Sequence, residues 1–496
     1  MTPTVPMDPT TPVISGFHPD PTICRVGEEF YLANSSFEYF PGAPLWRSAD
    51  LVSWTQVGNV LTRRSQFPAG DCRDSGGIFG STLRHHDGRF WFVTTNMSDF
   101  GRGHLIVSTD DPAGEWSEPV HTAGAIGIDP DLAWGPDEEC YLTWCSFPHG
   151  GAIAQARLDL ATGTLLEEPR LLWAGTGLAY PEGPHLYQRG EYWYLVIAEG
   201  GTERGHVVSV ARATHPTGPF ESHPSNPVFS HRSLAHPVHN VGHADLFERP
   251  DGSWAAVYLG ARPNGNTPGY SPLGRETYLA GIDWVDDWPR FVAPDRDAHG
   301  PSEFSDDFTA PVLDPRWVAP AGEPRRFATP GPHGLHLTRE PDDGHRSLLC
   351  TRIRHLAWQA EARFDPATEG RLVLRLDSRH WYSVESDAAG VRVTTRVGPF
   401  TQVVAEAPAP AAGFALVITA EPPAGAGTMG ANLGPDDIIL GYRDGDSTTV
   451  LARLDGRYLT TEVAGGFTGR MIGVGARTGT ALLRDFHCEP TETGNA

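Results

Sequence analysis

Three acidic side chains stand at stiff corners that lead into apolar or aromatic stretches. Asp20 lies between two prolines in GFHPDPT, Asp129 lies in GIDPDL, and Glu182 lies in YPEGPHLY. Burial disfavours a charged carboxylate, so acids in such places call for a functional explanation. A carboxyl group with a raised pKa beside an ionised one suits general acid/base catalysis, including glycoside hydrolysis. For any one corner taken alone, the alternative is an ordinary turn with a solvated acid.

The corners precede a phrase that recurs along the first part of the chain. A turn followed by an alternating strand-like run occurs five times, at intervals of about 50 to 62 residues: VGEEFYLANS (26–35), DGRFWFVTTN (87–96), DEECYLTWCS (137–146), RGEYWYLVIA (189–198) and DGSWAAVYLG (251–260). Most copies are followed by a second hairpin-like phrase, such as RSADLVSWTQVG. Each repeat has room for four strands, and five such sheets arranged radially form a five-bladed β-propeller.

Corresponding residues of the five repeats precede the innermost strands. They are Asp20, Gly80, Asp129, Glu182 and His243. Glu182 stands one residue earlier than the others, which predicts a bulge at Gly183. Because equivalent inner strands start at one mouth of a propeller channel, we expect the three acids and His243 to ring one cavity. At least one of these carboxyl groups should then have a raised pKa.

Beyond residue 290 the repeat gives way to a new pattern. A polar stretch with Pro and Gly is typical of a linker, and alternating strands such as RLVLRL (371–376) and RMIGVGA (470–476) follow it. We predict an all-β chain with these parts: a disordered N-terminal segment (1–10), a five-bladed β-propeller (11–292), a linker (293–303), a β-sandwich (304–490) and a loose tail (491–496).

The chain is acidic overall, with a formal charge of −23. Such a surface repels phosphate backbones and anionic lipid, so nucleic acid and membranes are not expected partners, whereas neutral sugars are not repelled. The chain has no basic start followed by an apolar stretch, and the six cysteines are scattered without metal-binding spacing. We therefore expect a cytoplasmic protein, and a homo-oligomer remains open.

Together the corner motifs resemble glycoside hydrolase family 43, in its β-xylosidase/α-L-arabinofuranosidase branch. The matching stretches span both predicted domains and include GFHPDPTICRVGEEFYLANSSFEYFPG, GIDPDL, YPEGPHLY, IAEGGTERGH, HPVHNVGHADL, LGRETYLAGIDW and TTEVAGGFTGRMIGVGA. The resemblance implies a five-bladed propeller, a concanavalin-like β-sandwich, and cleavage of glycosidic bonds with inversion. It also implies that Asp20 is the general base, that Glu182 is the general acid, and that Asp129 orients the acid and keeps its pKa high.

Three phenylalanines resemble aromatic residues around the family's sugar pocket. Phe37 and Phe79 match pocket walls, and Phe467 resembles an aromatic that the sandwich inserts to close one end of the pocket. For all three the alternative is core packing. The family often has aromatic-Ala-Pro-Thr where this chain has FGST (79–82), and the missing bulk beside the pocket leaves the preferred sugar open.

Polar residues are also implied by the resemblance. Arg275 resembles an arginine that hydrogen-bonds the terminal sugar, with a structural salt bridge as the alternative, and Thr202 is a further pocket candidate. His243 resembles a histidine on the propeller axis, which holds a hydrogen-bond network, a water or, in some relatives, a metal ion. Asp307 and Asp485 fall where such sandwich domains can bind structural calcium, which prefers oxygen ligands.

These observations predict an inverting exo-glycosidase that releases terminal β-D-xylose from short xylo-oligosaccharides. The expected partners are neutral pentose oligosaccharides, and no cofactor is required. An α-L-arabinofuranosidase, or an enzyme with both activities, is the alternative, because the two sugars present similar hydroxyl patterns. A carbohydrate-binding propeller without activity is a second class, and the effect of Glu182→Ala would distinguish it. The chain lacks a phosphate-binding loop and a GxSxG motif, which disfavours nucleotide-binding enzymes and serine hydrolases.

Overall fold

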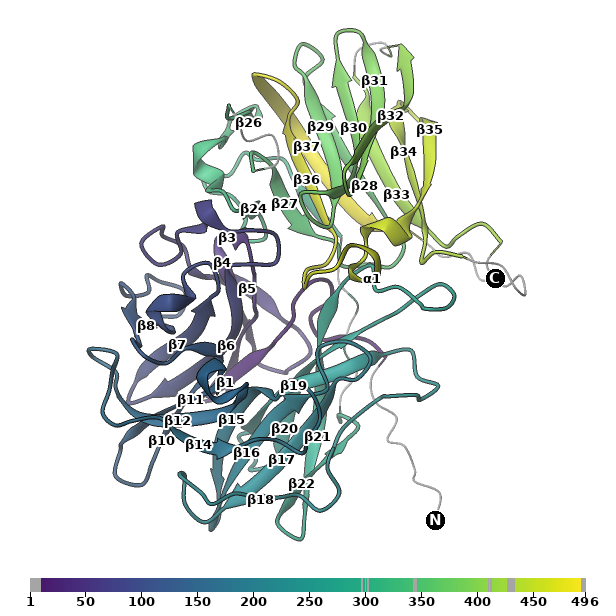
Figure 1. Ribbon diagram of the computed structural model, residues 1–496. Coiled ribbons are helices and arrows are strands. Elements are labelled where there is room, and N and C mark those ends of the chain that lie inside the picture. The colour runs from purple at the N-terminus through teal and green to yellow at the C-terminus, as the bar shows by residue number, and fades with distance from the viewer. Residues whose placement is uncertain are drawn as a thin grey trace.

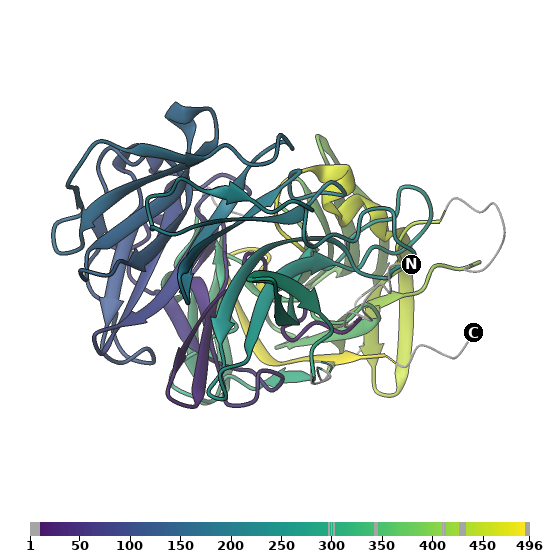
Figure 2. The same cartoon turned by 90° about the horizontal axis from the view of Figure 1, so that it is seen from below.

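The chain folds into two β-sheet units that lie side by side (Figures 1 and 2). The structure, a computed structural model, describes residues 10–295, 298, 300, 303–341, 346–408, 410, 413–425 and 433–491. The predicted N-terminal segment lies outside the described residues except for Thr10, and so does the predicted tail except for Thr491. Within the part of the chain that is described, no helix has the length and apolar character needed to cross a membrane.

The first unit is a propeller of five sheets. Blade 1 contains β1 (Thr22–Val26), β2 (Glu29–Ala33), β4 (Gly42–Ser48) and β5 (Thr55–Leu61); blade 2 contains β6 (Ile78–His86), β7 (Arg89–Asn96), β8 (Leu105–Thr109) and β9 (Val120–His121). Blade 3 contains β10 (Gly127–Trp134), β11 (Cys140–Ser146) and β12 (Ala152–Asp159), with β13 (Thr164–Leu165) and β14 (Arg170–Trp173) both paired to β12. Blade 4 contains β15 (Glu182–Arg189), β16 (Tyr192–Glu199), β17 (Val207–Ala213) and β18 (Glu221–Ser222). Blade 5 contains β19 (His239–Glu248), β20 (Trp254–Ala261), β21 (Arg275–Val285) and β22 (Trp288–Val292).

The propeller ring is closed by contacts between neighbouring inner strands. β1, β6, β10, β15 and β19 contact one another in that order, and β19 contacts β1. The N-terminal stretch also lies on the last blade, where Val13 and Ile14 donate backbone hydrogen bonds to Thr277 in β21. The second strands are rich in aromatic and branched residues that favour β structure, and β16 buries seven of the eight residues in YWYLVIAE. The repeats therefore become equivalent sheets around one axis.

The second unit is a β-sandwich of two antiparallel sheets. One sheet has the order β25-β26-β37-β28-β33-β34-β35 with β23 paired to β37, and the other has the order β27-β36-β29-β30-β31-β32. The first contains β23 (Phe304–Asp306), β25 (Ala328–Gly331), β26 (Gly334–Thr338), β28 (Trp358–Phe364), β33 (Ala415–Glu421), β34 (Asp437–Asp444), β35 (Ser447–Asp455) and β37 (Thr480–Pro490). The second contains β27 (Leu349–Arg352), β29 (Gly370–Arg375), β30 (His380–Asp387), β31 (Gly390–Val397), β32 (Phe400–Pro408) and β36 (Met471–Ala476).

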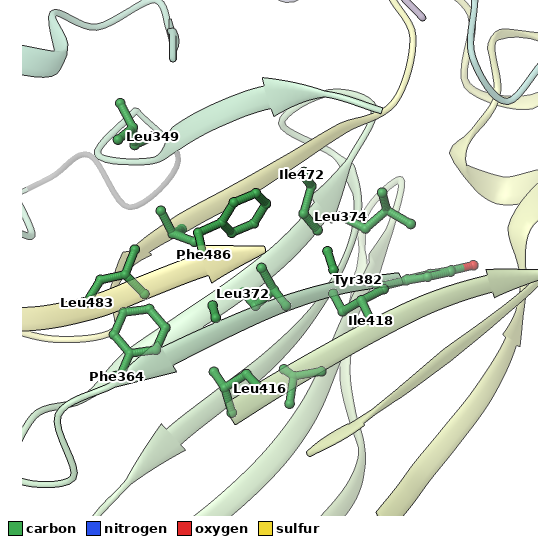
Figure 3. Close-up of a cluster of buried hydrophobic side chains, with 14 of the residues drawn as sticks. Leu349, Phe364, Leu372, Leu374, Tyr382, Leu416, Ile418, Ile472, Leu483 and Phe486 are labelled. Atoms are coloured by element: carbon green, nitrogen blue, oxygen red, sulfur yellow. The ribbon is translucent and has the colours of Figure 1, made fainter. Parts of the chain in front are cut away.

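The sandwich core lies between its two sheets (Figure 3). Leu372, Leu374 and Ile472 come from one sheet and meet Leu416 and Ile418 from the other, all at most 1% exposed. Alternation along each strand places these side chains on the inner face. The predicted all-β architecture, a five-bladed propeller followed by a β-sandwich, is confirmed.

The two units share an apolar and polar interface. β3 (Tyr39–Phe40) of the propeller unit pairs with β24 (Ala319–Pro320), and Nη1 of Arg375 donates to the Tyr39 hydroxyl at 2.7 Å. Helical turns are short: η1 (Ala69–Asp71), η2 (Phe100–Arg102), η3 (Phe147–His149), η4 (Pro324–Arg326), η5 (Gly456–Leu459) and α1 (Thr461–Ala464). Figure 1 shows α1 of the second unit facing the propeller. Of the predicted linker, residues 296, 297, 299, 301 and 302 lie outside the described residues.

Candidate active site

The repeated corners share an unusual backbone conformation. Asp20, Asp129 and His243 have φ angles of 50°, 55° and 49°, in the left-handed region that aspartate tolerates better than most residues. In blade 4 this position is held by Gly183, at φ 56°, and the pairing of β15 with β16 shifts register between Glu182 and His185. The predicted bulge at Gly183 is confirmed, and similar shifts occur in blades 2, 3 and 5. Glu182 therefore enters the site from one residue earlier than its counterparts.

The corners bring together a set of side chains that we call the acid cluster: Asp20, Asp129, Glu182, His243 and Arg275. Asp20 is its most strongly paired acid, because Oδ1 lies 3.0 Å from Nη1 of Arg275 and 3.2 Å from Nδ1 of His243. Its Oδ2 accepts a hydrogen bond from the Ser35 hydroxyl at 2.6 Å. Burial raises the pKa of Asp20, but Arg275 and His243 outweigh burial and hold it well below its usual value. Asp20 is therefore ionised.

Glu182 has the opposite electrostatic environment. Burial, followed by the negative charge of Asp129, raises the pKa of Glu182 to about 8. Its side chain keeps 19% of its surface exposed, so it can reach a bound molecule. At neutral pH Glu182 consequently carries a proton close to an ionised carboxylate.

Asp129 and His243 connect these two acids. Oδ2 of Asp129 accepts a hydrogen bond from the backbone N–H of Gly183 at 3.1 Å, which ties it to the corner of Glu182. Burial raises the pKa of Asp129, His243 opposes the rise and Asp20 adds to it. Burial lowers the pKa of His243, but contact with Asp20 outweighs this and raises it to about 9. His243 is therefore a cation inside the ring.

Gly80 supplies space for the cluster. A Cβ atom on Gly80 would lie 2.4 Å from Oδ1 of Asp129 and 2.9 Å from Cε1 of His243. The missing bulk at this position does not leave empty space beside the pocket, because Asp129 and His243 fill it. Gly80, which distinguishes the FGST stretch from the pattern of the family, therefore makes room for the carboxylate of Asp129.

Three aromatic rings from both units stand together beside the acid cluster. The rings of Phe37 and Phe467 stack with centroids 5.7 Å apart, and Phe79 lies 5.0 Å from Phe37 and 5.8 Å from Phe467. Phe467 is 38% exposed and its backbone N–H donates to the Ser75 hydroxyl, so it does not belong to the sandwich core. Phe37 is 2% exposed and also packs in the interface core. The sandwich thus completes a wall of the propeller site.

Arg275 joins this wall to the acids. Its Nη1 donates to Asp20 and, at 3.0 Å, to the Thr202 hydroxyl, while Nη2 donates to the backbone oxygen of Phe467 at 3.1 Å. A cavity of about 1130 Å³ begins at Thr202, Arg275 and Phe467. It continues between propeller loops and the sandwich residues 461–468. The arrangement can hold a polar ligand at the cluster with part of it extending into this cavity.

A second buried set of charges lies further along the same inner strands. This axial network contains Arg84, Asp131, His185, Tyr187 and Asp245. Arg84 donates to Asp131 at 2.8 Å and to Asp245 at 2.9 Å, and the Tyr187 hydroxyl donates to Asp245 at 2.5 Å. We did not predict this network from the sequence. The sequence does contain a signal for it. Asp131 and Asp245 stand two residues after Asp129 and His243, and alternate residues of a strand share a face.

The predicted calcium residues do not form a three-ligand group in the described part of the chain. Asp307 accepts hydrogen bonds from the backbone and hydroxyl of Thr309, and Asp485 lies 3.4 Å from Nε of Arg363. The set of potential metal ligands found among the described residues is instead Glu303, His487 and Glu489. Calcium binding by Asp307 and Asp485 stays a prediction that these contacts do not support.

Comparison with known proteins gives matches over both units. The model of glycosyl hydrolases family 43 matches residues 9–289, and that of the β-xylosidase C-terminal concanavalin A-like domain matches residues 305–481. A xylosidase/arabinosidase of Butyrivibrio fibrisolvens is 44% identical over 292 residues, which cover 56% of this chain and 55% of that protein. That match therefore spans about half the length of the relative.

Two further comparisons cover nearly the whole chain. The non-reducing end α-L-arabinofuranosidase BoGH43B of Bacteroides ovatus is 34% identical over 497 residues, covering 93% of this chain and 90% of that protein. The solved structure described as "Bacteroides ovatus Xyloglucan PUL GH43B" superimposes with a TM-score of 0.87 at 32% identity, covering 97% of this chain and 99% of that one. The chain belongs to glycoside hydrolase family 43, and it is a glycoside hydrolase with the family's propeller and a concanavalin-like sandwich.

Proposed function

We propose that this protein is an exo-acting pentosidase that removes a terminal sugar from short oligosaccharides with inversion of configuration. The observation that carries the proposal is the opposite protonation of two acids in one cluster. Asp20 is ionised by its contacts with Arg275 and His243, and Glu182 is protonated by burial and by Asp129. An ionised acid and a protonated acid are the two groups that hydrolysis of a glycoside by two carboxyl groups needs, and inversion is inferred from the resemblance to the family.

In this proposal each acid has one role. Asp20 accepts a proton from the attacking water, and its contacts with Arg275 and His243 fix its orientation. Glu182 gives its proton to the leaving glycosidic oxygen as the bond breaks. Asp129 does not transfer a proton; its charge keeps Glu182 protonated, and its bond to Gly183 N–H fixes the corner that carries the acid.

The wall formed by Phe37, Phe79 and Phe467 supports removal of single terminal sugars. Because Phe467 comes from the sandwich, it closes the pocket on one side and leaves the 1130 Å³ cavity on the other for the leaving saccharide. Arg275 and Thr202 line this cavity, and Arg275 also contacts Asp20 of the acid cluster, so both are placed to hydrogen-bond sugar hydroxyls. A closed end favours cleavage at a chain terminus.

We propose β-D-xylose as the released sugar, with neutral xylo-oligosaccharides as substrates. α-L-Arabinofuranose is the second candidate, favoured by the nearly full-length similarity to an arabinofuranosidase. The Butyrivibrio relative is named for both activities, xylosidase and arabinosidase, so we keep both sugars as candidates.

Rates of hydrolysis of the 4-nitrophenyl β-D-xyloside and α-L-arabinofuranoside test the choice of sugar. Proton NMR of the sugar first released tests the stereochemistry, and we expect the inverted anomer. Release of the retained anomer would exclude the proposed roles of Asp20 and Glu182. Failure to cleave either pentoside, with the fold intact, would reject the proposed sugar class.

A further inference from the structure

A buried histidine on the β16–β17 connection faces the proposed general acid. His206 stands directly before β17 and is 1% exposed. Its Nε2 lies 3.7 Å from Oε1 of Glu182, and it has no hydrogen-bond partner among the described residues. A buried polar atom without a partner is uncommon and calls for an explanation.

The other ring nitrogen determines what Nε2 can do. Nδ1 of His206 lies 3.0 Å from the backbone oxygen of Asn240, which only accepts hydrogen bonds, so Nδ1 carries the hydrogen. Burial lowers the pKa of His206 to about 3, and the ring is neutral at ordinary pH. A neutral imidazole protonated at Nδ1 has a lone pair at Nε2. That atom can therefore only accept a hydrogen bond.

The position of His206 is fixed by its neighbours. A Cβ atom on Gly242 of β19 would lie 2.3 Å from Cε1 of the ring, so glycine is needed there to admit it. The backbone N–H of His206 donates to the Glu203 oxygen at 3.1 Å. The ring is thus held between the β16–β17 connection of blade 4 and the inner strand β19 of blade 5, with its lone pair toward Glu182.

We propose that His206 is a positioning residue that keeps Glu182 in its protonated form in the unliganded enzyme, by accepting a hydrogen bond from the carboxyl group at Nε2. This inference rests on the proposed role of Glu182 as the acid. The 3.7 Å separation between Nε2 and Oε1 is longer than a hydrogen bond, so the proposal requires the Glu182 carboxyl group to move toward Nε2 in the free enzyme. An ionised Glu182 would face the same lone pair and be repelled by it.

The other groups around Glu182 act through charge. The charged or ionisable groups that face it are Asp20, Asp129, Cys145, His243 and Arg275. His243 and Arg275 favour the ionised acid, whereas Asp129 and Asp20 favour the protonated one. The charges that act on His206 itself are His243, Arg275 and Asp20. Within this set His206 is the neutral acceptor, so it stabilises the proton on Glu182 without adding charge.

Blade 2 contains a matched histidine for which no acid partner is found in the described part of the chain. His104 stands directly before the third strand of its blade, as His206 does, is 1% exposed, and also has an unpartnered Nε2. Burial lowers the pKa of His104 to about 3 as well, but its ring packs against Trp144 at a centroid distance of 6.0 Å. Substitution of His104 therefore controls for loss of a buried imidazole.

The test compares His206→Leu, which removes the acceptor, with His206→Gln, which keeps an amide oxygen near the position of Nε2, and with His104→Leu. We expect the alkaline limb of kcat/KM for a disaccharide substrate to move down by about one pH unit or more in His206→Leu, because the protonated acid loses a hydrogen bond. His206→Gln and His104→Leu should keep the limb near its original position. The proposal would be overturned if the alkaline limb of the pH profile stays in place in His206→Leu, or if His104→Leu moves it by the same amount.

A second measurement needs no turnover and so stands apart from the proposed function. In protein labelled with ¹⁵N-histidine, the His206 resonances, assigned by their loss in His206→Gln, should report hydrogen on Nδ1 and none on Nε2. The Nε2 signal should shift as Glu182 ionises near pH 8 and should not do so in Glu182→Gln. Hydrogen on Nε2, or no shift with pH, would overturn the proposal even if His206→Leu does not fold.

Discussion

The propeller axis carries two buried sets of charges that differ in how completely they are paired. In the axial network, Asp245 is 0% exposed, and its oxygens meet Arg84, the Tyr187 hydroxyl, the Thr22 hydroxyl and a backbone N–H. In the acid cluster, the contact found for Glu182 in the described residues is His206 at 3.7 Å. The two sets stand on the same inner strands.

The pKa values of the acids in the two sets depend on how completely each acid is paired. Burial raises the pKa of Asp245, but Arg84 outweighs burial and holds it at about 2. For Glu182 burial and Asp129 act together and raise the pKa to about 8. Burial raises the pKa of both acids, and it leaves a structural acid where a cation and hydrogen bonds compensate it, and an acid able to give up a proton where they do not.

The largest expected effect comes from removing the incompletely paired acid. Glu182→Gln keeps the shape of the side chain but has no proton to donate, so kcat on xylobiose should fall by about 10²–10⁴-fold. The loss on a 4-nitrophenyl glycoside should be much smaller, because that leaving group departs without protonation. The thermal midpoint should not fall, since the contact found for the Glu182 side chain among the described residues is the 3.7 Å approach to His206. Equal losses on both substrates would contradict the role of acid.

The same change in the axial network should affect stability instead. Asp245→Asn leaves Arg84 with less compensating charge in a buried site, which should destabilise the fold by about 3–5 kcal/mol. The free energy of unfolding from urea titration measures this. In the fraction that remains folded, kcat on the same substrates should stay close to that of the unaltered enzyme. A stable but inactive Asp245→Asn would mean that the two sets are not separate.

Gly80 offers a way to disturb the acid cluster without removing any of its groups. Gly80→Ala places a methyl group where Asp129 and His243 now lie, so both must move. A displacement of about 1 Å can lower activity by about 100-fold, and we expect a loss of that order in kcat. Gly58→Ala in β5 is the control, because a Cβ atom there meets nothing within 4 Å. Activity like that of the control would show that the cluster tolerates the shift.

The sequence predicted the elements that repeat and the residues at their corners. Five recurring turn-and-strand phrases determine the propeller, and the register of Asp20, Asp129 and His243 within them predicted that these side chains meet. The bulge predicted at Gly183 is present, but blades 3 and 5 have similar register shifts, so Glu182 is offset because Gly183 occupies the corner position that Asp129 and His243 hold in those blades. The local sequence pattern was sufficient to predict these positions because the blades of the propeller repeat the same geometry.

What the sequence did not reveal depends on contacts between elements. His206 carries no pattern of its own, and its role becomes visible only when Asn240 is found at Nδ1 and Glu182 at Nε2. Gly80 was interpreted as missing bulk, since the sequence does not show that Asp129 fills the space. The axial network could have been predicted from the period of two along each strand, which also includes Arg84, four residues past Gly80, but the pairing of Arg84 with both Asp131 and Asp245 is visible only in the fold.

The smallest expected effect separates the charge of Asp129 from its hydrogen bond. Asp129→Asn can still accept from the Gly183 N–H but no longer places a negative charge beside Glu182. Because that charge raises the pKa of Glu182, its removal should lower the pKa and move the alkaline limb of kcat/KM, expected near pH 8, down by about one unit. The direction follows from the role of the acid: activity requires protonated Glu182 and is lost as pH rises through its pKa.

The control for this prediction is Asp131→Asn, two residues along in the axial network. It should leave the alkaline limb in place because Arg84 pairs with Asp131. If Asp129→Asn and Asp131→Asn move the alkaline limb equally, charges along the whole propeller axis act on the pKa of Glu182. The difference in pairing between the axial network and the acid cluster would then not explain which acid donates the proton.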